Sequence, residues 1–374
     1  MRVEQTRWTS PKGWVEVSTN IEDKSSAQFV LLFADPDCLT DLSALKALQA
    51  RYPKASIVGG SSAGNILGEE VSDEDMVATA VYFEKSRVKV TAIEARPNVL
   101  REQAAEAAKS LREPDLKHLL VLSDGLSVNG SELAQGLNTI EDISVTGGLM
   151  GDKGRFEKTY VIVNGEVHQN GVVLVGFYGD DLDVRYGCFA GWDEFGVDRV
   201  ITKSKGNVVY EIDGQPALDL YKTYLGDFAD QLPITGLRFP LSIRLSHDRL
   251  LIRTLLAVDE EAQSLTFAGD VPEGSITLLM KGNTNGLIEG AKNAAKQAKG
   301  GQATGLAVVI SCVGRRQLMG QMVEEELEVA QQELGCDTTI TGFYSYGELA
   351  PYNDQFFECE LHNQTMTLFA IYEK

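Results

Sequence analysis

A short glycine-containing phrase occurs three times along the chain, and it constrains the fold more than any other feature. Each copy has a β-branched start, a glycine, and a second glycine four or five residues later. The copies are IVGGSSAG (57–64), VTGGLMG (145–151) and ITGFYSYG (340–347). Internal repetition of this kind indicates that one structural unit has been used several times.

The segments around each phrase repeat as well. A short apolar run that ends in a polar loop comes before each copy, and a helix-like segment follows that run. These runs are FVLLFADPD (29–37), LLVLSDGLS (119–127) and LAVVISCVGRR (306–316). A strand-like run comes after each copy: ATAVYFE (78–84), VVLVGFYG (172–179) and MTLFAIY (366–372). The spacing is too irregular for a solenoid, so the pattern predicts duplicated α/β units with parallel strands and crossover helices.

We therefore expect an α/β (mixed α+β) fold class, with two domains built from repeated β-α-β-glycine turn-β units and mixed sheets. A length of 374 residues fits two domains at roughly 150 residues each. The expected division is a lead-in segment at 1–26, a first domain at 27–214 and a second at 215–374. Pro216 marks the boundary, because proline is well tolerated where a helix begins. The glycine bends are expected to leave a hollow for a small ligand.

Charge, cysteine content and hydropathy narrow the class of protein. The formal net charge of −20 argues against a nucleic-acid partner, which requires a basic face. The N-terminal residues show no signal-peptide pattern, and no apolar run approaches the ~18 residues of a membrane span. Five scattered cysteines without a CxxC pair favour neither a disulfide framework nor a zinc site. These features predict a cytoplasmic protein without membrane insertion.

The segment GSSAG (60–64) matches the G-x-S-x-G elbow of serine hydrolases, which would make Ser62 a nucleophile. That elbow requires a helix directly after the serine, whereas residues 65–75 are acidic and have no apolar stripe. A glycine turn that lets two backbone segments approach is the favoured interpretation. We expect no catalytic residues and a protein that is not an enzyme, with a serine hydrolase as a remote alternative.

Polar residues at the ends of the apolar runs are better placed for ligand binding. In open α/β sheets, ligands lie beyond the carboxyl ends of the strands, and an arginine there can hold a carboxylate with two hydrogen bonds. The alternative is a pair of ordinary exposed arginines, Arg315 and Arg316. The candidate ligand-binding residues are Ser61, Ser62, Ser123, Asp124, Arg315, Tyr344 and Tyr346.

The chain has four histidines, His118, His168, His247 and His362, and none lies at metal-ligand spacing from another. A single histidine in an apolar pocket can nevertheless hold a haem iron from one side. His247 lies in a polar turn between two expected strands, and His362 lies where the final strand begins.

Several longer motifs, in this order, resemble the FIST family. They are GNVVYEIDGQPALDLY (206–221), LAVDEEAQSLTFAGDVPEGS (256–275), SCVGRRQLMG (311–320), GFYSYGELAP (342–351) and CELHNQTMTL (359–368). GGSSAG and TGGLMGD resemble its N-terminal half, so the likeness covers about residues 27–374. The resemblance implies a FIST N domain followed by a FIST C domain, in an intracellular sensory module for small ligands, with amino acids proposed. Such modules often precede kinase, cyclase or methyl-accepting output domains. None is found here, so a separate partner would receive the signal.

A subset of the family that lacks an output domain is also similar to this chain. Those members bind haem, sense nitric oxide, and control a partner histidine kinase or cyclic-di-GMP enzyme. The resemblance therefore implies haem as cofactor, with His247 and His362 as candidate ligands. His247 is placed first as the iron ligand, because the general motif does not call for a histidine there, whereas His362 belongs to it. An amino-acid sensor without haem remains the alternative, and a homodimer remains open.

Overall fold

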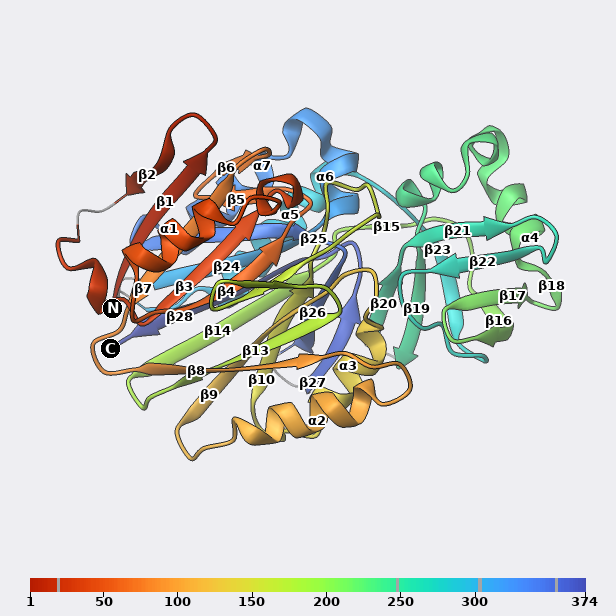
Figure 1. Cartoon of the computed structure of the whole chain (residues 1–374). Coiled ribbons are helices and arrows are strands. Elements are labelled where there is room, and N and C mark those ends of the chain that lie inside the picture. The colour runs from red at the N-terminus through yellow and green to blue at the C-terminus, as the bar shows by residue number, and fades with distance from the viewer. Residues whose placement is uncertain (19–20, 247–248, 302–304, 354–355) are drawn as a thin grey trace.

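Three strand–helix–strand units form the body of the protein, and each repeats the same order of elements (Figure 1). The computed structural model describes residues 1–18, 21–246, 249–301, 305–353 and 356–374. Each unit contains a first strand, two parallel strands joined by a helical crossover, and a last strand that lies between the first strand and one of the parallel strands, antiparallel to both. The three glycine phrases occupy the same position in the three units, at the carboxyl end of the second parallel strand.

The bounds of the elements show how closely the units correspond. Unit 1 contains β1 (Arg2–Thr9), β2 (Gly13–Ser18), β3 (Phe29–Ala34), α1 (Ser43–Arg51), β4 (Ser56–Ser61) and β7 (Met76–Tyr82). Unit 2 contains β8 (Arg87–Glu94), α2 (Leu100–Ser110), β9 (Leu116–Ser123), α3 (Gly130–Leu137), β10 (Ser144–Leu149) and β13 (Gly171–Tyr178). Unit 3 contains β14 (Leu182–Phe189), α5 (Thr284–Ala298), β24 (Gly305–Cys312), α6 (Val313–Met319), α7 (Glu325–Leu334), β25 (Thr338–Ser345) and β28 (Met366–Glu373).

The units exchange hairpins in a ring. After each glycine phrase the chain leaves its own sheet and adds a hairpin to the sheet of another unit. These hairpins are β5–β6 (Asn65–Leu67, Glu70–Ser72), β11–β12 (Val161–Val163, Glu166–His168) and β26–β27 (Gly347–Asn353, Phe356–His362). Strand β5 pairs with β25 of unit 3, β11 with β4 of unit 1, and β26 with β10 of unit 2. Each sheet therefore contains a hairpin from a different unit.

The first glycine of each phrase has the same structural reason in all three units. A Cβ atom at Gly59 would lie 1.7 Å from the carbonyl oxygen of the neighbouring parallel strand, and one at Gly147 or Gly342 would lie 1.9 Å from it. No residue with a side chain can occupy such a position without moving a strand. The repeated first glycine is therefore explained by the close approach of two parallel strands in each unit.

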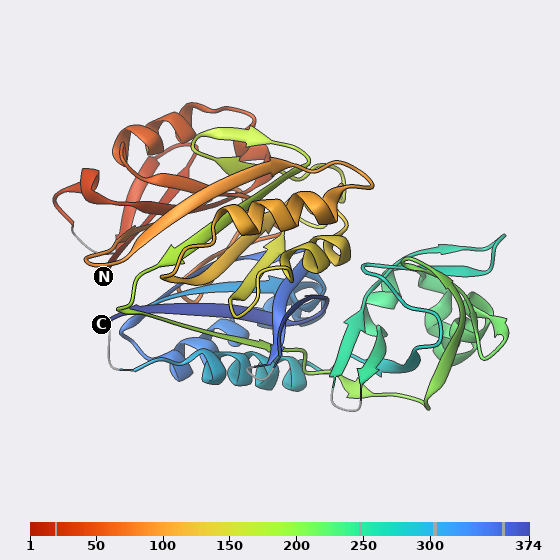
Figure 2. The ribbon, with the colours of Figure 1, turned by 90° about the horizontal axis from the view of Figure 1, so that it is seen from below.

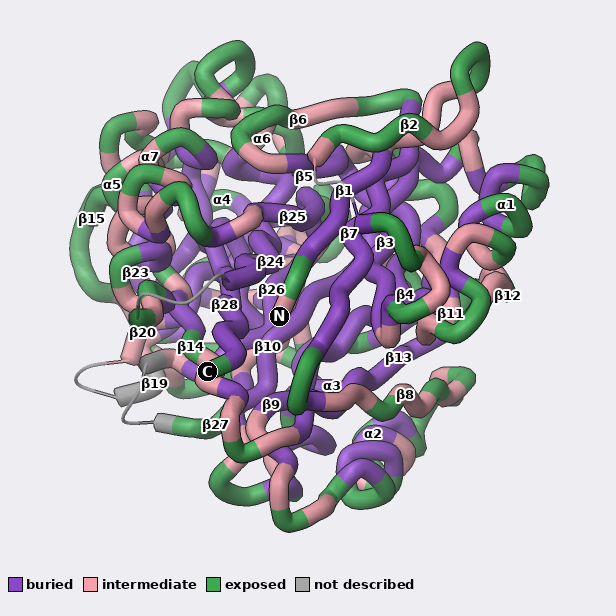
Figure 3. Tube along the Cα trace, turned by 90° about the vertical axis from the view of Figure 1, so that its left-hand side faces the viewer, coloured by how far each residue is buried: buried purple, intermediate pink, exposed green. Residues whose placement is uncertain are grey.

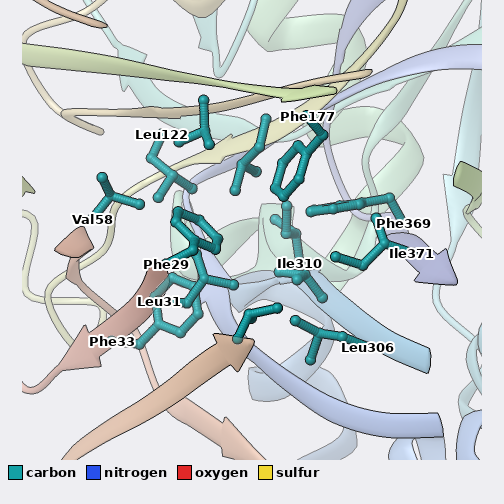
Figure 4. Packing of buried hydrophobic residues seen from close by; sticks show 14 of the residues in the cluster. Phe29, Leu31, Phe33, Val58, Leu122, Phe177, Leu306, Ile310, Phe369 and Ile371 are labelled. Atoms are coloured by element: carbon teal, nitrogen blue, oxygen red, sulfur yellow. The ribbon is translucent and has the colours of Figure 1, made fainter. Parts of the chain in front are cut away.

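The inner faces of the three sheets meet in one apolar core (Figure 4). Alternate residues of the central strands contribute to it, for example Phe29, Leu31 and Phe33 of β3 and Leu306 and Ile310 of β24. The remaining residues of these strands face the helices: α1 covers the first sheet, α2 and α3 the second, and α5 and α7 the third. Burial on both faces explains why these strands are continuous apolar runs, and Figure 3 shows them buried along their length.

On the inner side of the sheets, the space beside the paired glycines Gly59–Gly60 and Gly147–Gly148 is filled with side chains. A Cβ atom at Gly60 would lie 2.3 Å from the sulfur of Met150, and one at Gly148 would lie 2.6 Å from a methyl carbon of Ile310. Phe33 and Phe343 stack nearby, with ring centroids 4.7 Å apart. At Gly60 and Gly148, the glycine directly after the first one therefore makes room for a neighbouring side chain rather than for a ligand.

A small β-rich domain, residues 193–281, is inserted in unit 3 between β14 and α5, beside the three sheets (Figure 2). Its strands are β15 (Asp193–Glu194), β16 (Arg199–Lys205), β17 (Val208–Ile212), β18 (Gln215–Pro216), β19 (Leu241–Ser246), β20 (Arg249–Arg253), β21 (Leu255–Asp259), β22 (Ser264–Phe267) and β23 (Ile276–Lys281). Helix α4 (Ala217–Leu225) packs on them, followed by the short helices η3 (Gly226–Gln231) and η4 (Ile234–Arg238). The chain enters and leaves through adjacent strands, since Asp193 of β15 lies opposite Lys281 of β23.

The fold class is confirmed: the protein has mixed sheets with parallel pairs, helical crossovers and repeated units. The packing divides the chain differently from the expected boundary at 214–216. That boundary lies inside the small domain, where β18 pairs with β17 and α4 follows directly. Residues 1–26 include β1, which is hydrogen-bonded to β7 within the first sheet. No helix in the described ranges combines the length and the hydrophobicity that crossing a membrane would require.

Candidate functional site

The candidate ligand-binding residues lie at one end of the body, where the three glycine phrases are joined by backbone hydrogen bonds. The amide of Ala63 donates to the carbonyl of Tyr344 (2.9 Å), and the amide of Tyr346 donates to that of Leu149 (2.9 Å). The amide of Gly151 closes the ring by donating to the carbonyl of Ser61 (3.3 Å). The three strand ends are thus held together through their backbones.

The polar side chains at these strand ends are buried and bind other parts of the protein. Ser62 Oγ donates to Asn65 Oδ1 (2.6 Å), and Ser61 Oγ accepts from the amide of Tyr160 (2.9 Å). Ser123 Oγ donates to the carbonyl of Asp124 (3.1 Å). The Asp124 carboxylate accepts the amides at 126 and 127 (2.9 Å each) and the amide at 170 (3.2 Å). These four residues shape the turns of the ring.

Arg315 is also buried, in a network that the sequence did not reveal. Its guanidinium donates to Glu326 Oε2 (2.8 Å) and to the carbonyls of Ala190 (2.6 Å) and Leu287 (2.8 Å). Tyr344 donates its hydroxyl to the other oxygen of Glu326 (2.7 Å), and burial together with this carboxylate raises the pKa of Tyr344. The guanidinium of Arg315 is thus already paired, and it ties the small domain's entry segment to α7.

Tyr346 is the candidate at the strand ends that reaches a cavity. This Tyr346 cavity has a volume of about 370 Å³ and lies between the body, including Phe156, and small-domain residues such as Phe267 and Asp270. The tyrosine ring stacks on Phe156, with centroids 4.4 Å apart, and its hydroxyl donates to Asp152. Burial and the Asp152 carboxylate raise the pKa of Tyr346.

A second cavity, the His362 cavity, has a volume of about 340 Å³ and lies at the joint between the body and the small domain. Its walls are mostly apolar and come from six separate segments of the chain. They include Phe189, Trp192, Leu250, Ile252, Met280, Tyr352, His362 and Thr365. Of the two histidines proposed as haem ligands, His362 lines this cavity, whereas His247 lies outside the described residues.

The protonation state of His362 follows from its surroundings. Its Nε2 lies 3.1 Å from the carbonyl oxygen of Ala350, which can only accept, so the proton is on Nε2 and the lone pair is on Nδ1. Burial lowers the pKa of His362 to about 4, and the imidazole is therefore neutral at physiological pH. The ring of Tyr352 is stacked with it at a centroid distance of 6.5 Å.

His362 belongs to the segment through which the body contacts the small domain. The carbonyl of Leu361 accepts from buried Arg253 (2.9 Å), and the side chain of Asn363 accepts from the amide of Thr254 (3.3 Å). Gln364 accepts through its carbonyl from the indole of Trp192 (3.0 Å) and donates from its side chain to the carbonyl of Leu237 (3.3 Å). A ligand that displaced His362 would therefore act on the contacts of residues 361–364, which set the joint.

Glu348, which belongs to no motif selected as a binding site, lies directly behind the His362 cavity. It is fully buried and accepts from the hydroxyls of Ser345 (2.6 Å) and Thr365 (2.9 Å), and Thr365 also lines the cavity. Burial raises the pKa of Glu348 to about 7. Its position depends on the exchange of β26 into another sheet, a pairing that no local pattern reveals.

The remaining histidines have other surroundings. His118 lies inside the body, with its ring nitrogens 2.7 Å from Ser144 Oγ and 2.8 Å from Thr146 Oγ1. His168 is on the surface beside Glu166. No cluster of three or more His, Cys, Asp or Glu residues able to hold a metal ion occurs in the part of the chain that the structure describes.

Comparisons with known proteins agree with the motifs. Residues 28–215 match the FIST N domain, and residues 217–351 match the FIST C domain. The chain is 24% identical over 373 residues to an uncharacterized protein of Methanocaldococcus jannaschii, covering 89% of this chain and 71% of that protein. A crystal structure of cyanuric acid hydrolase from A. caulinodans aligns with 100% of this chain and 99% of its own, with a TM-score of 0.39 and 9% identity.

Proposed function

The chain belongs to the FIST family, whose two domains suggest a sensory module for a small ligand, and we propose that its ligand binds in the His362 cavity. The observation that carries this proposal is the position of His362: a neutral imidazole lines an apolar cavity at the joint of two domains. A ligand changes a conformational equilibrium only when it binds one state more tightly than the other. A cavity with walls from both domains meets that condition, because moving the small domain changes the walls.

We further propose haem as the ligand, and the chemistry of the cavity fits it. A histidine that binds a metal usually donates its other ring nitrogen to a carbonyl or a carboxylate, which fixes the tautomer. The hydrogen bond from His362 Nε2 to the Ala350 carbonyl does this and leaves the lone pair on Nδ1. Phe189, Trp192 and Met280 supply an apolar lining.

When bound, haem would supply an iron atom able to coordinate nitric oxide. The residues of the chain have three tasks in this proposal. His362 holds the group from one side, the apolar walls exclude water, and residues 361–364 carry any displacement of His362 to Arg253 and Thr254 of the small domain. We propose binding without turnover, since the hydroxyl of Ser62 donates to Asn65 rather than to a histidine.

The signal is proposed to pass to a separate protein, such as a histidine kinase or a cyclic-di-GMP enzyme. The described cysteines, Cys38, Cys188, Cys312, Cys336 and Cys359, are all free thiols, which suits the cytoplasmic setting proposed for such a partner.

An absorption spectrum of the purified protein reconstituted with haem tests the ligand. We expect a Soret band in the wild type, and its loss or displacement in His362→Gln, because glutamine can still donate to the Ala350 carbonyl but has no imidazole. His168→Gln is the matched control, since His168 lies on the surface away from the cavity, and its spectrum should equal that of the wild type.

Two results would overturn parts of this proposal. Absence of a Soret band after reconstitution removes haem, while an unchanged band in a folded His362→Gln protein removes His362 as the ligand. The alternative, an amino-acid sensor, predicts instead a higher melting temperature with one amino acid, because a ligand that binds only the folded state stabilises it. The carboxylate of that amino acid would need a partner other than Arg315, whose guanidinium is paired with Glu326.

A further inference from the structure

A third cavity, the Phe228 cavity, lies on the side of the small domain that carries α4, η3 and η4. Its volume is about 390 Å³, and aromatic side chains form much of its lining. The rings of Phe195 and Phe228 flank Phe239, with centroid distances of 6.1 and 5.4 Å. Phe228 is 51% exposed and Phe195 is 38% exposed. Exposed aromatic rings gathered around a hollow indicate a place where a flat apolar group can bind.

Two cationic side chains, Arg238 and Lys281, line the same cavity. Within the described residues, neither has a carboxylate within ion-pair distance, although the chain has 54 acidic and 34 basic side chains. Other arginines of the small domain are paired: Arg199 with Asp213 (2.9 Å) and Arg244 with Asp198 (2.9 Å). The ammonium of Lys281 lies 5.9 Å from the ring centroid of Phe195. The cavity therefore combines aromatic walls with two cations that form no ion pair among the described residues, and Asp193, opposite Lys281 on the neighbouring strand, is a carboxylate close to them.

The start of α5 adds to this positive charge. Thr284, the first residue of this 15-residue helix, lines the cavity, and the first turn of the helix contains no acidic residue. The backbone amides of that turn carry partial positive charge. The nearest capping side chain, Asn283, binds the amide of Asn285 and donates to Asp193 (3.0 Å), so one carboxylate lies beside the turn.

We propose that the Phe228 cavity is a second binding site, and that it takes an organic anion with an aromatic body, such as an aryl carboxylate. The charged end lies near Arg238 and Lys281, and the body lies against Phe195 and Phe228. The site goes beyond the ligand proposed for the His362 cavity. Because Thr284 and Leu318 of the body complete its lining, a molecule bound there contacts both domains.

Calorimetric titration with 4-phenylbutyrate and with its neutral amide, 4-phenylbutyramide, tests the site. We expect saturable binding of the carboxylate and binding weaker by about tenfold or more for the amide, which lacks the charge that the cations attract. The double variant R238Q/K281Q should weaken binding of the carboxylate by a similar factor, and Phe228→Ala should weaken both compounds. All three substituted side chains are solvent-exposed, so the variants should fold.

The double variant R101Q/K109Q is the matched control, because it removes the same two charges from the exposed face of α2, which lies along the lower edge of the body outside the small domain (Figure 1). It should bind 4-phenylbutyrate like the wild type, and so should His362→Gln, which separates this site from the haem proposal. Three results would each refute the proposal: no saturable binding of 4-phenylbutyrate, equal binding of acid and amide, or an unchanged affinity in R238Q/K281Q. Displacement of 4-phenylbutyrate by equimolar inorganic phosphate would refute the aromatic part of the site.

Discussion

Single residues in this protein show why a polar side chain at a strand end is an ambiguous signal. Arg315 and Asp124 lie where ligands bind in many α/β proteins, yet the charged groups of both form hydrogen bonds with other parts of the protein. What the sequence could not reveal is the partner: Glu326 lies on another helix, and Asp124 binds backbone amides. Arg238 and Lys281 line a cavity and have no ion-pair partner among the described residues, but neither lies in a sequence motif that predicts a binding site.

Glu348 gives a prediction at the residue scale. Its folded pKa, about 7, lies above its ordinary value of 4.5, so the folded state holds the proton more tightly than the unfolded state. This raised pKa therefore lowers stability as pH rises from about 4.5 to about 7, by on the order of 3 kcal/mol in total. Glu348→Gln has no such dependence, because its amide can donate to Ser345 and accept from Thr365 at every pH.

Urea unfolding of wild type and Glu348→Gln at several pH values checks this. The difference in unfolding free energy between the two proteins should grow in favour of the variant over that interval and be constant below it. Glu328→Gln, an exposed carboxylate on α7, supplies the same loss of charge as a control. A difference that is flat in pH would show that folding does not raise the pKa of Glu348.

At the scale of elements, the sequence predicted the repeated units but not how they combine. Apolar runs, helix-like segments and glycine phrases are local signals, and they located the central strands of all three units. The exchange of hairpins depends on pairing between residues far apart in the chain, such as Gly342 with Ile66. No periodicity within one segment identifies its pairing partner in another unit, so the sequence patterns predicted the strands without the pairing of the hairpins.

The first glycine of each phrase gives a prediction for the strands that contain it. Gly147→Ala should lower the unfolding free energy by about 1–3 kcal/mol, because its methyl group would meet the Val121 carbonyl of β9 at 1.9 Å. Gly59→Ala and Gly342→Ala should behave alike, since their positions are equivalent. The control Gly301→Ala has nothing within 4 Å and should change stability by less than about 0.5 kcal/mol. Urea midpoints at constant slope measure these values. Equal midpoints for Gly147→Ala and Gly301→Ala would contradict the close backbone contact at Gly147, and unequal effects of Gly59→Ala, Gly147→Ala and Gly342→Ala would contradict the equivalence of the three units.

The molecule as a whole is a closed body with a domain inserted into one unit. The four apolar clusters of the body contain no residue from 193–281, and the small domain has its own cluster. The two join along residues 361–364 and at the connecting strands, and all three cavities described above lie along or beside this joint. The position of the insertion thus determines where ligands can affect the arrangement of the domains.

Excision of the small domain tests this division. Joining Asp193 to Lys281 through Asn-Gly, a two-residue turn suited to adjacent antiparallel strands, should leave a body that unfolds cooperatively on heating. The same protein should give no Soret band with haem, because Leu250 and Ile252 no longer form a wall of the His362 cavity. A body that fails to fold would mean that the small domain is needed for the core, and a retained band would place haem elsewhere.

The ring of exchanged hairpins has a further effect on how sequence changes are felt. A substitution in β5 or β6 removes support first from β25, about 275 residues further along the chain, rather than from its neighbour β4. A destabilising substitution in the hairpin of one unit therefore weakens the sheet of another unit. Each sheet depends on a hairpin whose residues belong to a different unit. Three copies tied in this way must stay compatible with one another as their sequences diverge.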